Sequence, residues 1–134
     1  MATVVVIGGG ASGMAAALRA AQTAENRVIL LERQARVGRK LLSTGNGRCN
    51  LTNLNLSPAR YHGEDPAFSG PILTRFDSGA ALDFFHDLGL ITVAEPDGRV
   101  YPLSNQANSV LDVLRFGLEA AGVELRTGEP ARDL

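Results

Sequence analysis

The sequence VVVIGGGASGMAAALRAA, residues 4–21, joins a buried-strand pattern to a helix pattern through a run of glycines. The apolar, β-branched run 3–7 lacks polar alternation, which is typical of a strand covered on both faces in a parallel sheet. Small and straight-chain residues from Ala11 to about Ala24 predict a helix, with Asn26 as its end. Residues 27–32, RVILLE, repeat the strand pattern. The sequence therefore predicts a βαβ unit within an α/β, Rossmann-like fold.

Each glycine of the G-x-G-x-x-G spacing has a separate task in such a unit. Gly8 permits the tight turn after the strand, Gly10 lets the backbone approach a pyrophosphate, and Gly13 lets the helix pack closely on the sheet. Ala11 and Ser12 open the helix, whose free N–H groups and positive dipole end favour a phosphate. Structural turns also match this spacing, so the glycines alone do not decide between the two interpretations.

Glu32 supplies the context that the glycines need. It ends the second predicted strand, 19 residues beyond Gly13. A carboxylate there can accept hydrogen bonds from both hydroxyls of an adenosine ribose, and it repels a 2′-phosphate. The sequence therefore predicts an adenine-dinucleotide site and disfavours NADP in it. The alternative is a structural turn beside a surface glutamate.

A second glycine-containing segment, RVGRKLLSTGNGRCNLTN at residues 36–53, favours FAD over NAD. Its backbone N–H groups and small polar side chains can follow an extended ligand, with Arg39, Lys40 or Arg48 near the phosphates. No acidic residue lies between Glu32 and Glu64, which is consistent with an anion nearby. A mobile polar loop, or a solvated basic one, remains the alternative.

The rest of the chain predicts a mixed architecture. A short helix is possible at residues 39–43, and two short helices are expected at residues 66–76 and 78–89, the second with Ser78 as N-cap and Gly89 as stop. The run 90–102 predicts a hairpin around Pro-Asp-Gly. Apolar spacing predicts a helix within 104–122, and residues 123–127 predict a third parallel strand.

Composition narrows the class of protein. The 134 residues carry a net charge of −1, which gives no argument for nucleic acid or an anionic membrane as partner. No apolar run reaches about 18 residues, so no membrane span is expected. The single cysteine, Cys49, fits a reducing compartment, and we expect a cytoplasmic protein with one domain or part of one.

The motifs GGGASGMAAA, LLER, GRKLLSTGNGRCNLTN and GRVYPLSNQANSVLDVL together resemble the N-terminal part of the BaiN-type flavoproteins, an aminoacetone-oxidase-like family of FAD-binding enzymes. The resemblance spans almost the whole chain, and the third motif is far more specific than the glycine fingerprint. It implies an FAD-dependent oxidoreductase of the two-dinucleotide-binding-domain type. Members are longer, with an inserted second domain, so residues 1–134 are expected to be the N-terminal part of the FAD-binding domain.

The resemblance implies that the glycine turn holds the FAD pyrophosphate, that Glu32 holds the adenosine ribose, and that residues 39–50 run along the cofactor toward the flavin. NADH or NADPH is a candidate electron donor to the intact protein, and the substrate is expected to be a small molecule. The predicted cofactor contacts are Gly8, Gly10, Ala11, Ser12, Gly13, Glu32, Arg33, Arg39, Lys40, Leu41, Ser43, Thr44, Gly45, Asn46, Gly47, Arg48, Cys49 and Asn50.

No catalytic residue is assigned, because hydride chemistry in such proteins belongs to the flavin. Without a C-x-x-C partner, Cys49 is expected to be a small buried or loop residue rather than a redox thiol. The histidines and the cysteine show no metal-ligand spacing. Two other functions remain open from the residues: an NAD-binding dehydrogenase domain, and an inactive truncated remnant.

Overall fold

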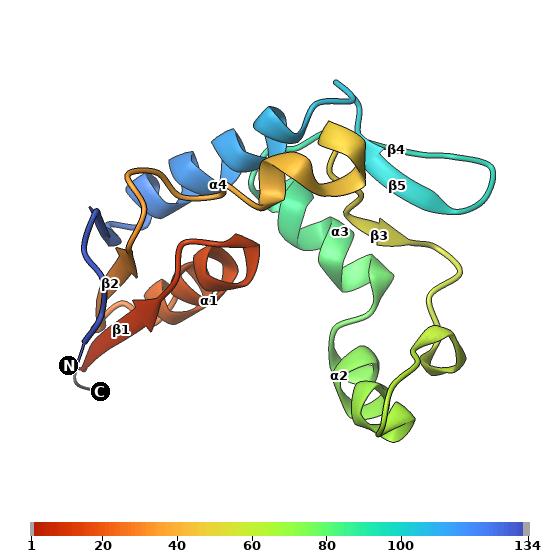
Figure 1. Cartoon of the computed structure of the whole chain (residues 1–134), viewed down its shortest axis with the longest axis horizontal. Helices are drawn as coiled ribbons and strands as arrows, with labels where there is room; N and C mark the ends of the chain where they lie inside the picture. Colours follow the sequence, from red (N-terminus) through yellow and green to blue (C-terminus); the bar gives the residue numbers. More distant parts are fainter. Residues whose placement is uncertain (1, 133–134) are drawn as a thin grey trace.

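A computed structural model describes residues 2–132, and it contains the predicted βαβ unit (Figure 1). The unit extends into a parallel sheet of order β1-β2-β6, with Val5 beside Ile29 and Leu30 beside Leu125. Its elements are β1 (Thr3–Ile7), α1 (Ala11–Ala21), β2 (Arg27–Glu32), α4 (Ala107–Ala120) and β6 (Glu124–Thr127). The predicted α/β class and third parallel strand are therefore confirmed.

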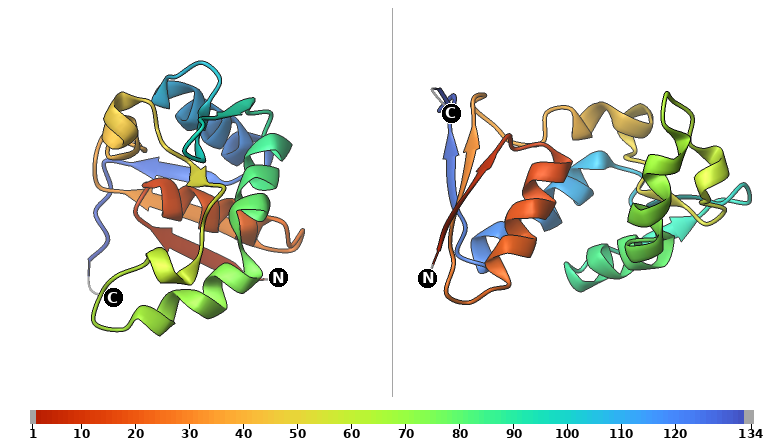
Figure 2. Two further views of the ribbon diagram at one scale, coloured as in Figure 1. Left: turned by 90° about the vertical axis from the view of Figure 1, so that its right-hand side faces the viewer. Right: turned by 90° about the horizontal axis from the view of Figure 1, so that it is seen from below.

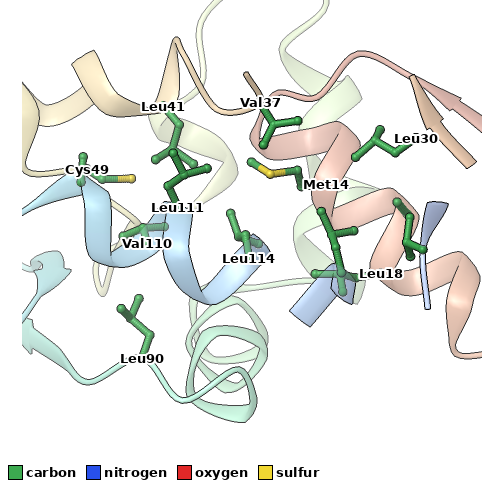
Figure 3. Close-up of a cluster of buried hydrophobic side chains, with 14 of the residues drawn as sticks. Met14, Leu18, Leu30, Val37, Leu41, Cys49, Leu90, Val110, Leu111 and Leu114 are labelled. Atoms are coloured by element: carbon green, nitrogen blue, oxygen red, sulfur yellow. The ribbon is translucent and has the colours of Figure 1, made fainter. Parts of the chain in front are cut away.

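Helices α1 and α4 lie on the same face of this sheet (Figure 2). Val4 and Val6 of β1 point into the core beneath them, whereas Val5 and Ile7 are each 50% exposed. The prediction that β1 is covered on both faces is thus wrong for the described chain, because both helices that cross the sheet pack on one side. The core joins α1, α4 and β2 to the segment after β2, as the labelled side chains in Figure 3 show.

The middle of the chain builds a second, antiparallel sheet of order β3-β5-β4 with helices beside it (Figure 1). The predicted hairpin is confirmed as β4 and β5. Strand β3 has only two residues in a polar stretch, so no strand pattern marks it in the sequence. The remaining elements are the 3-10 helices η1 (Leu41–Gly47), η2 (Pro58–Arg60) and η3 (Pro66–Phe68), the helices α2 (Ser69–Arg75) and α3 (Ser78–Asp87), and the strands β3 (Thr52–Asn53), β4 (Thr92–Ala94) and β5 (Arg99–Pro102).

Two predicted helix boundaries need correction. The N-cap of α3 is Asp77, not Ser78, because the Asp77 carboxylate accepts a hydrogen bond from the Ala80 N–H at 2.8 Å. Helix α1 ends at Ala21 rather than near residue 24. Asn26 still serves that end, since its side-chain amide donates to the Ala20 carbonyl at 3.1 Å. Within residues 2–132, no helix is long and apolar enough to cross a membrane.

Candidate functional site

The glycine turn leads directly from β1 into α1. Gly8 has φ +100°, which other residues rarely adopt, and its N–H donates to the Leu31 carbonyl at 2.8 Å. Gly10 is the N-cap of α1, and no side chain caps the first turn, which contains no acidic residue. The N–H groups and positive dipole end of α1 are therefore available to an anion.

The glycines of this turn differ in whether the surrounding chain would accommodate a side chain. A Cβ on Gly13 would lie 1.8 Å from the Gly8 carbonyl oxygen, so the packing of the helix on the turn excludes any side chain. A Cβ on Gly10 would meet no atom of residues 2–132 within 4 Å, and Gly10 has an ordinary φ of −79°. Neither packing nor conformation of the chain requires glycine there. The space beside Gly10 is thus free for a group outside the chain.

The sequence pattern assigns no role to Gly9, but the structure shows one. A Cβ on Gly9 would lie 2.5 Å from a methyl carbon of Val37 and 3.1 Å from the Glu32 Cβ. The Gly9 carbonyl also accepts a hydrogen bond from the Gly38 N–H at 2.7 Å. The segment after β2 therefore lies against the turn, which brings two glycine-containing segments together.

The Glu32 carboxylate ties the same two segments. Its Oε2 accepts a hydrogen bond from the Gly9 N–H at 2.7 Å, and its Oε1 accepts one from the Gln34 N–H at 2.8 Å. Each carboxylate oxygen can accept a further bond, so both retain capacity for a ligand hydroxyl. Glu32 is only partly buried. The sequence missed this internal role, because nothing in a strand pattern shows which backbone groups a terminal carboxylate will meet.

These bonds predict a pH dependence. The Gln34 N–H lowers the pKa of Glu32 below 4.5, and the Gly9 N–H and the Arg33 charge act in the same direction, against partial burial that raises it. The ionised carboxylate therefore stabilises the fold above about pH 5, and this stabilisation is lost as the pH falls through the lowered pKa. We expect urea unfolding to show wild type more stable than Glu32→Gln at neutral pH, with the difference shrinking below about pH 4. A difference that is unchanged from pH 6 to pH 3 would contradict this account.

A cavity of about 390 Å³ opens beside Glu32 at the carboxyl ends of β1 and β2. Residues that follow β6 form its far wall, and the Glu129 N–H donates to the Glu32 carbonyl at 3.1 Å. Parallel order places these residues here, because β6 ends beside β2. No sequence motif marks them. The lining residues are Ile7, Gly8, Leu31, Glu32, Arg33, Glu129, Pro130 and Ala131.

The basic residues that follow β2 do not lie together in the structure. Arg33 lines the cavity beside Glu32, whereas Arg36 and Arg39 line a second cavity of about 630 Å³ between residues 34–42, α4 and β6. Arg39 donates to the Gln34 side chain at 3.5 Å. Lys40 is exposed just before η1. The structure thus does not bring Arg33 and Arg39 to one wall.

Residues 43–50 form a turn, part of which belongs to the 3-10 helix η1. Their polar side chains bond to the chain itself: Ser43 donates to the Lys40 carbonyl, Thr44 to the Leu41 carbonyl, and Asn50 to two carbonyls of neighbouring strands. Leu41 and Cys49 are buried in the core beneath, as Figure 3 shows, which agrees with the expectation for Cys49. The exposed members of the predicted set within residues 43–50 are Ser43, Thr44, Asn46, Gly47 and Asn50.

Arg48 is engaged with three other segments of the chain. Its guanidinium bonds to Glu95 at 2.5 Å and to Asn105 at 2.8 and 3.0 Å, and it lies over the Tyr101 ring at 3.8 Å. Glu95 and Tyr101 belong to the β4–β5 hairpin, and Asn105 lies just before α4. The structure therefore places Arg48 at the join between residues 43–50 and the antiparallel sheet.

Comparison with known proteins agrees with this fold. The family model of the HI0933-like protein Rossmann domain matches residues 2–134. The chain is also similar to a crystal structure of Thermovibrio ammonificans THI4, with a TM-score of 0.65 at 18% identity. The superposed region covers 98% of this chain and 40% of the THI4 chain, which shows a shared fold.

Several curated relatives match at the sequence level. A 3-dehydro-bile acid delta(4,6)-reductase of Clostridium scindens is 47% identical over 124 residues, 92% of this chain. A ribosomal RNA dihydrouridine synthase of Escherichia coli is 33% identical over 122 residues, 91% of this chain. The chain spans 30% of the length of each relative. These matches confirm the resemblance drawn from the sequence motifs, and the chain belongs to the HI0933-like protein Rossmann-domain family.

Proposed function

We propose that residues 1–134 form the adenine-dinucleotide part of an FAD site. The observation that carries this proposal is the free space beside Gly10 at the uncapped start of α1, directly after Gly9, whose N–H bonds to the Glu32 carboxylate. The pyrophosphate would accept hydrogen bonds from backbone N–H groups at Gly10, Ala11 and Ser12. The ribose hydroxyls would donate to Glu32, and the cavity of about 390 Å³ would hold the adenosine.

The remainder of the cofactor is proposed to lie along residues 39–50. Within that range the exposed residues, such as Lys40, Asn46 and Gly47, are the ones able to touch a ligand, whereas buried Leu41 and Cys49 support the segment from beneath. When bound, FAD supplies the electron and hydride transfer, while the chain holds and orients it. This second segment favours FAD over NAD, because a plain nicotinamide-binding domain would continue from the acidic residue into a short turn and another helix.

For the whole protein we propose a flavin-dependent oxidoreductase, with NADH or NADPH as candidate donor. The names of both relatives describe the same change, since a delta(4,6)-reductase and a dihydrouridine synthase each add two hydrogens across a carbon–carbon double bond. The higher identity to the bile acid reductase favours a small-molecule substrate. The net charge of −1 in this segment gives no electrostatic support for RNA binding.

The proposal is tested first by the cofactor that the purified protein takes up. We expect a visible flavin absorption band after incubation with FAD and gel filtration, and a rise in melting temperature with FAD that exceeds the rise with NAD. Stabilisation by NAD without flavin uptake would favour the dehydrogenase alternative. The absence of saturable binding of either would favour an inactive remnant.

Glu32→Ala tests the ribose assignment. We expect FAD binding to weaken by about 1.5–3 kcal/mol, the range for hydrogen bonds to a charged group, or roughly 10- to 150-fold in Kd. Glu119→Ala, which removes an exposed carboxylate from the last turn of α4, is the matched control and should leave Kd unchanged. Because Glu32 also binds the Gly9 N–H, Kd is measured at a temperature where both variants are fully folded. Wild-type affinity in Glu32→Ala would show that the adenosine lies elsewhere.

A further inference from the structure

Arg48 joins residues 43–50 to parts of the chain that follow 47 to 57 residues later. Its Nη2 donates to the Glu95 carboxylate at 2.5 Å and to the Asn105 side-chain oxygen at 2.8 Å, and its Nε donates to the same oxygen at 3.0 Å. The guanidinium carbon lies 3.8 Å from the centre of the Tyr101 ring. The Arg48 guanidinium is therefore held by hydrogen bonds along its edge and by the Tyr101 ring on its face.

The partners of Arg48 are themselves fixed. Tyr101 is 3% exposed and belongs to β5. Glu95 also pairs with Arg99 at 3.4 Å. Asn105 has φ +56° just before α4, and its N–H donates to the Pro102 carbonyl at 2.8 Å. Arg48 is thus bound to residues that each make further contacts with the chain.

The segment beside Arg48 has an unusual backbone. Gly45, Asn46, Gly47 and Cys49 all have positive φ, between +54° and +82°. For Asn46 and Cys49 this conformation is unfavourable, and such residues persist where the surrounding structure fixes them. Gly45 also packs closely against Tyr101 and Asn50, because a Cβ there would come within 3.3 Å of the Tyr101 ring and 2.6 Å of the Asn50 backbone nitrogen. The Arg48 contacts fix this turn from its C-terminal end, together with the Asn50 side-chain bonds to the Thr52 and Val100 carbonyls.

We propose that Arg48 is a positioning residue that holds residues 44–50 in the conformation that faces the cofactor, and that it is not a ligand of the FAD phosphates. The proposal rests on the proposed function, since the segment it holds is the one assigned to FAD. A phosphate contact would compete with the bonds to Glu95 and Asn105, and the Glu95 carboxylate, which Arg48 shares with Arg99, already offsets part of the guanidinium charge.

The first test needs no cofactor and uses Cys49, the single cysteine of the chain. The thiol follows Arg48 directly and is 6% exposed, and burial raises its pKa while the Thr44 hydroxyl acts in the opposite direction. We expect Arg48→Met to react with Ellman's reagent at least tenfold faster than wild type at the same pH. Arg75→Met, on the exposed last turn of α2, is the control and should react like wild type. Equal rates in Arg48→Met and wild type would overturn the proposal.

The second test compares FAD binding in variants on both sides of the ion pair. If Arg48 positions the segment, Glu95→Gln and Arg48→Met each weaken FAD binding at least tenfold, and the double variant is no weaker than the worse single one. If Arg48 binds a phosphate directly, Glu95→Gln binds FAD as well as wild type or better, which would overturn the proposal. Asp97→Asn is the control, because it removes the 2.6 Å partner of Arg99 and leaves the Arg48 contacts in place.

The two measurements separate the possible failures. Should wild-type protein bind no FAD, the proposed function fails, and the thiol rates still decide whether Arg48 holds residues 44–50. Should Arg48→Met unfold, Glu95→Gln gives the same comparison with the guanidinium and its Tyr101 contact retained. Wild-type thiol reactivity in a folded Glu95→Gln variant that also binds FAD normally would overturn the role of the ion pair.

Discussion

Gly13→Ala is expected to destabilise the fold by about 3 kcal/mol, lowering the melting temperature by roughly 10 °C. The added Cβ would lie 1.8 Å from the carbonyl oxygen and 3.0 Å from the carbonyl carbon of Gly8. Both atoms belong to a turn that the bond from the Gly8 N–H to Leu31 ties to the sheet. A side chain cannot relieve this clash by changing rotamer, so α1 must move away from the core. The gain in helix propensity, up to about 1 kcal/mol, does not offset such a shift.

Gly10→Ala is the matched control for this effect. It makes the same chemical change three residues earlier in the same turn, where no atom lies within 4 Å of the new Cβ. We expect its melting temperature to stay within a few degrees of wild type, as for surface substitutions of about 0.5 kcal/mol. Thermal unfolding followed by circular dichroism compares the two. Similar melting temperatures for both variants would show that α1 does not pack on the Gly8 turn as described.

Gly10→Val is expected to leave the fold intact and to weaken FAD binding by about 100-fold or more, because its side chain occupies the space proposed for the pyrophosphate. The backbone of Gly10, at φ −79° and ψ −177°, suits a β-branched residue, so no strain is added. The variant should therefore melt like wild type without cofactor and lose most of the stabilisation that FAD gives to wild type.

Gly63→Val provides the control for Gly10→Val. Gly63 lies between η2 and η3, and a Cβ there also meets no atom within 4 Å. This variant should keep both the wild-type melting temperature and the full FAD-induced shift. An equal loss of the shift in both variants would point to a general effect of valine rather than a blocked pyrophosphate site.

The local parts of this molecule could be predicted from the sequence. The strands, the glycine turn and the helix start depend on residues within about 30 positions, and β1, β2 and the tasks of Gly8 and Gly13 agree with the structure. The fold class followed from this unit together with the third strand. The hairpin was predictable for the same reason, because its turn residues lie between two β-prone runs.

The remainder depends on contacts between distant residues, which no local pattern records. Glu129 reaches Glu32 only because β6 pairs with β2, and Arg48 meets Tyr101 only because the hairpin folds back onto residues 43–50. The apolar run of β1 predicted burial on both faces, but Val5 and Ile7 are exposed, because a run of apolar residues does not determine on which face of the sheet the helices pack. The Asp77 cap was missed because Ser78, beside it, is equally suited to that position by residue type.

Calorimetric titration of FAD into wild type and Gly10→Val, at one temperature where both are folded, shows whether the space beside Gly10 receives the cofactor. We expect saturable binding of one FAD per wild-type chain and no saturation by Gly10→Val over the same concentration range. FAD binding of equal affinity by the two proteins would contradict this expectation, because the free space beside Gly10 would then hold no part of the cofactor.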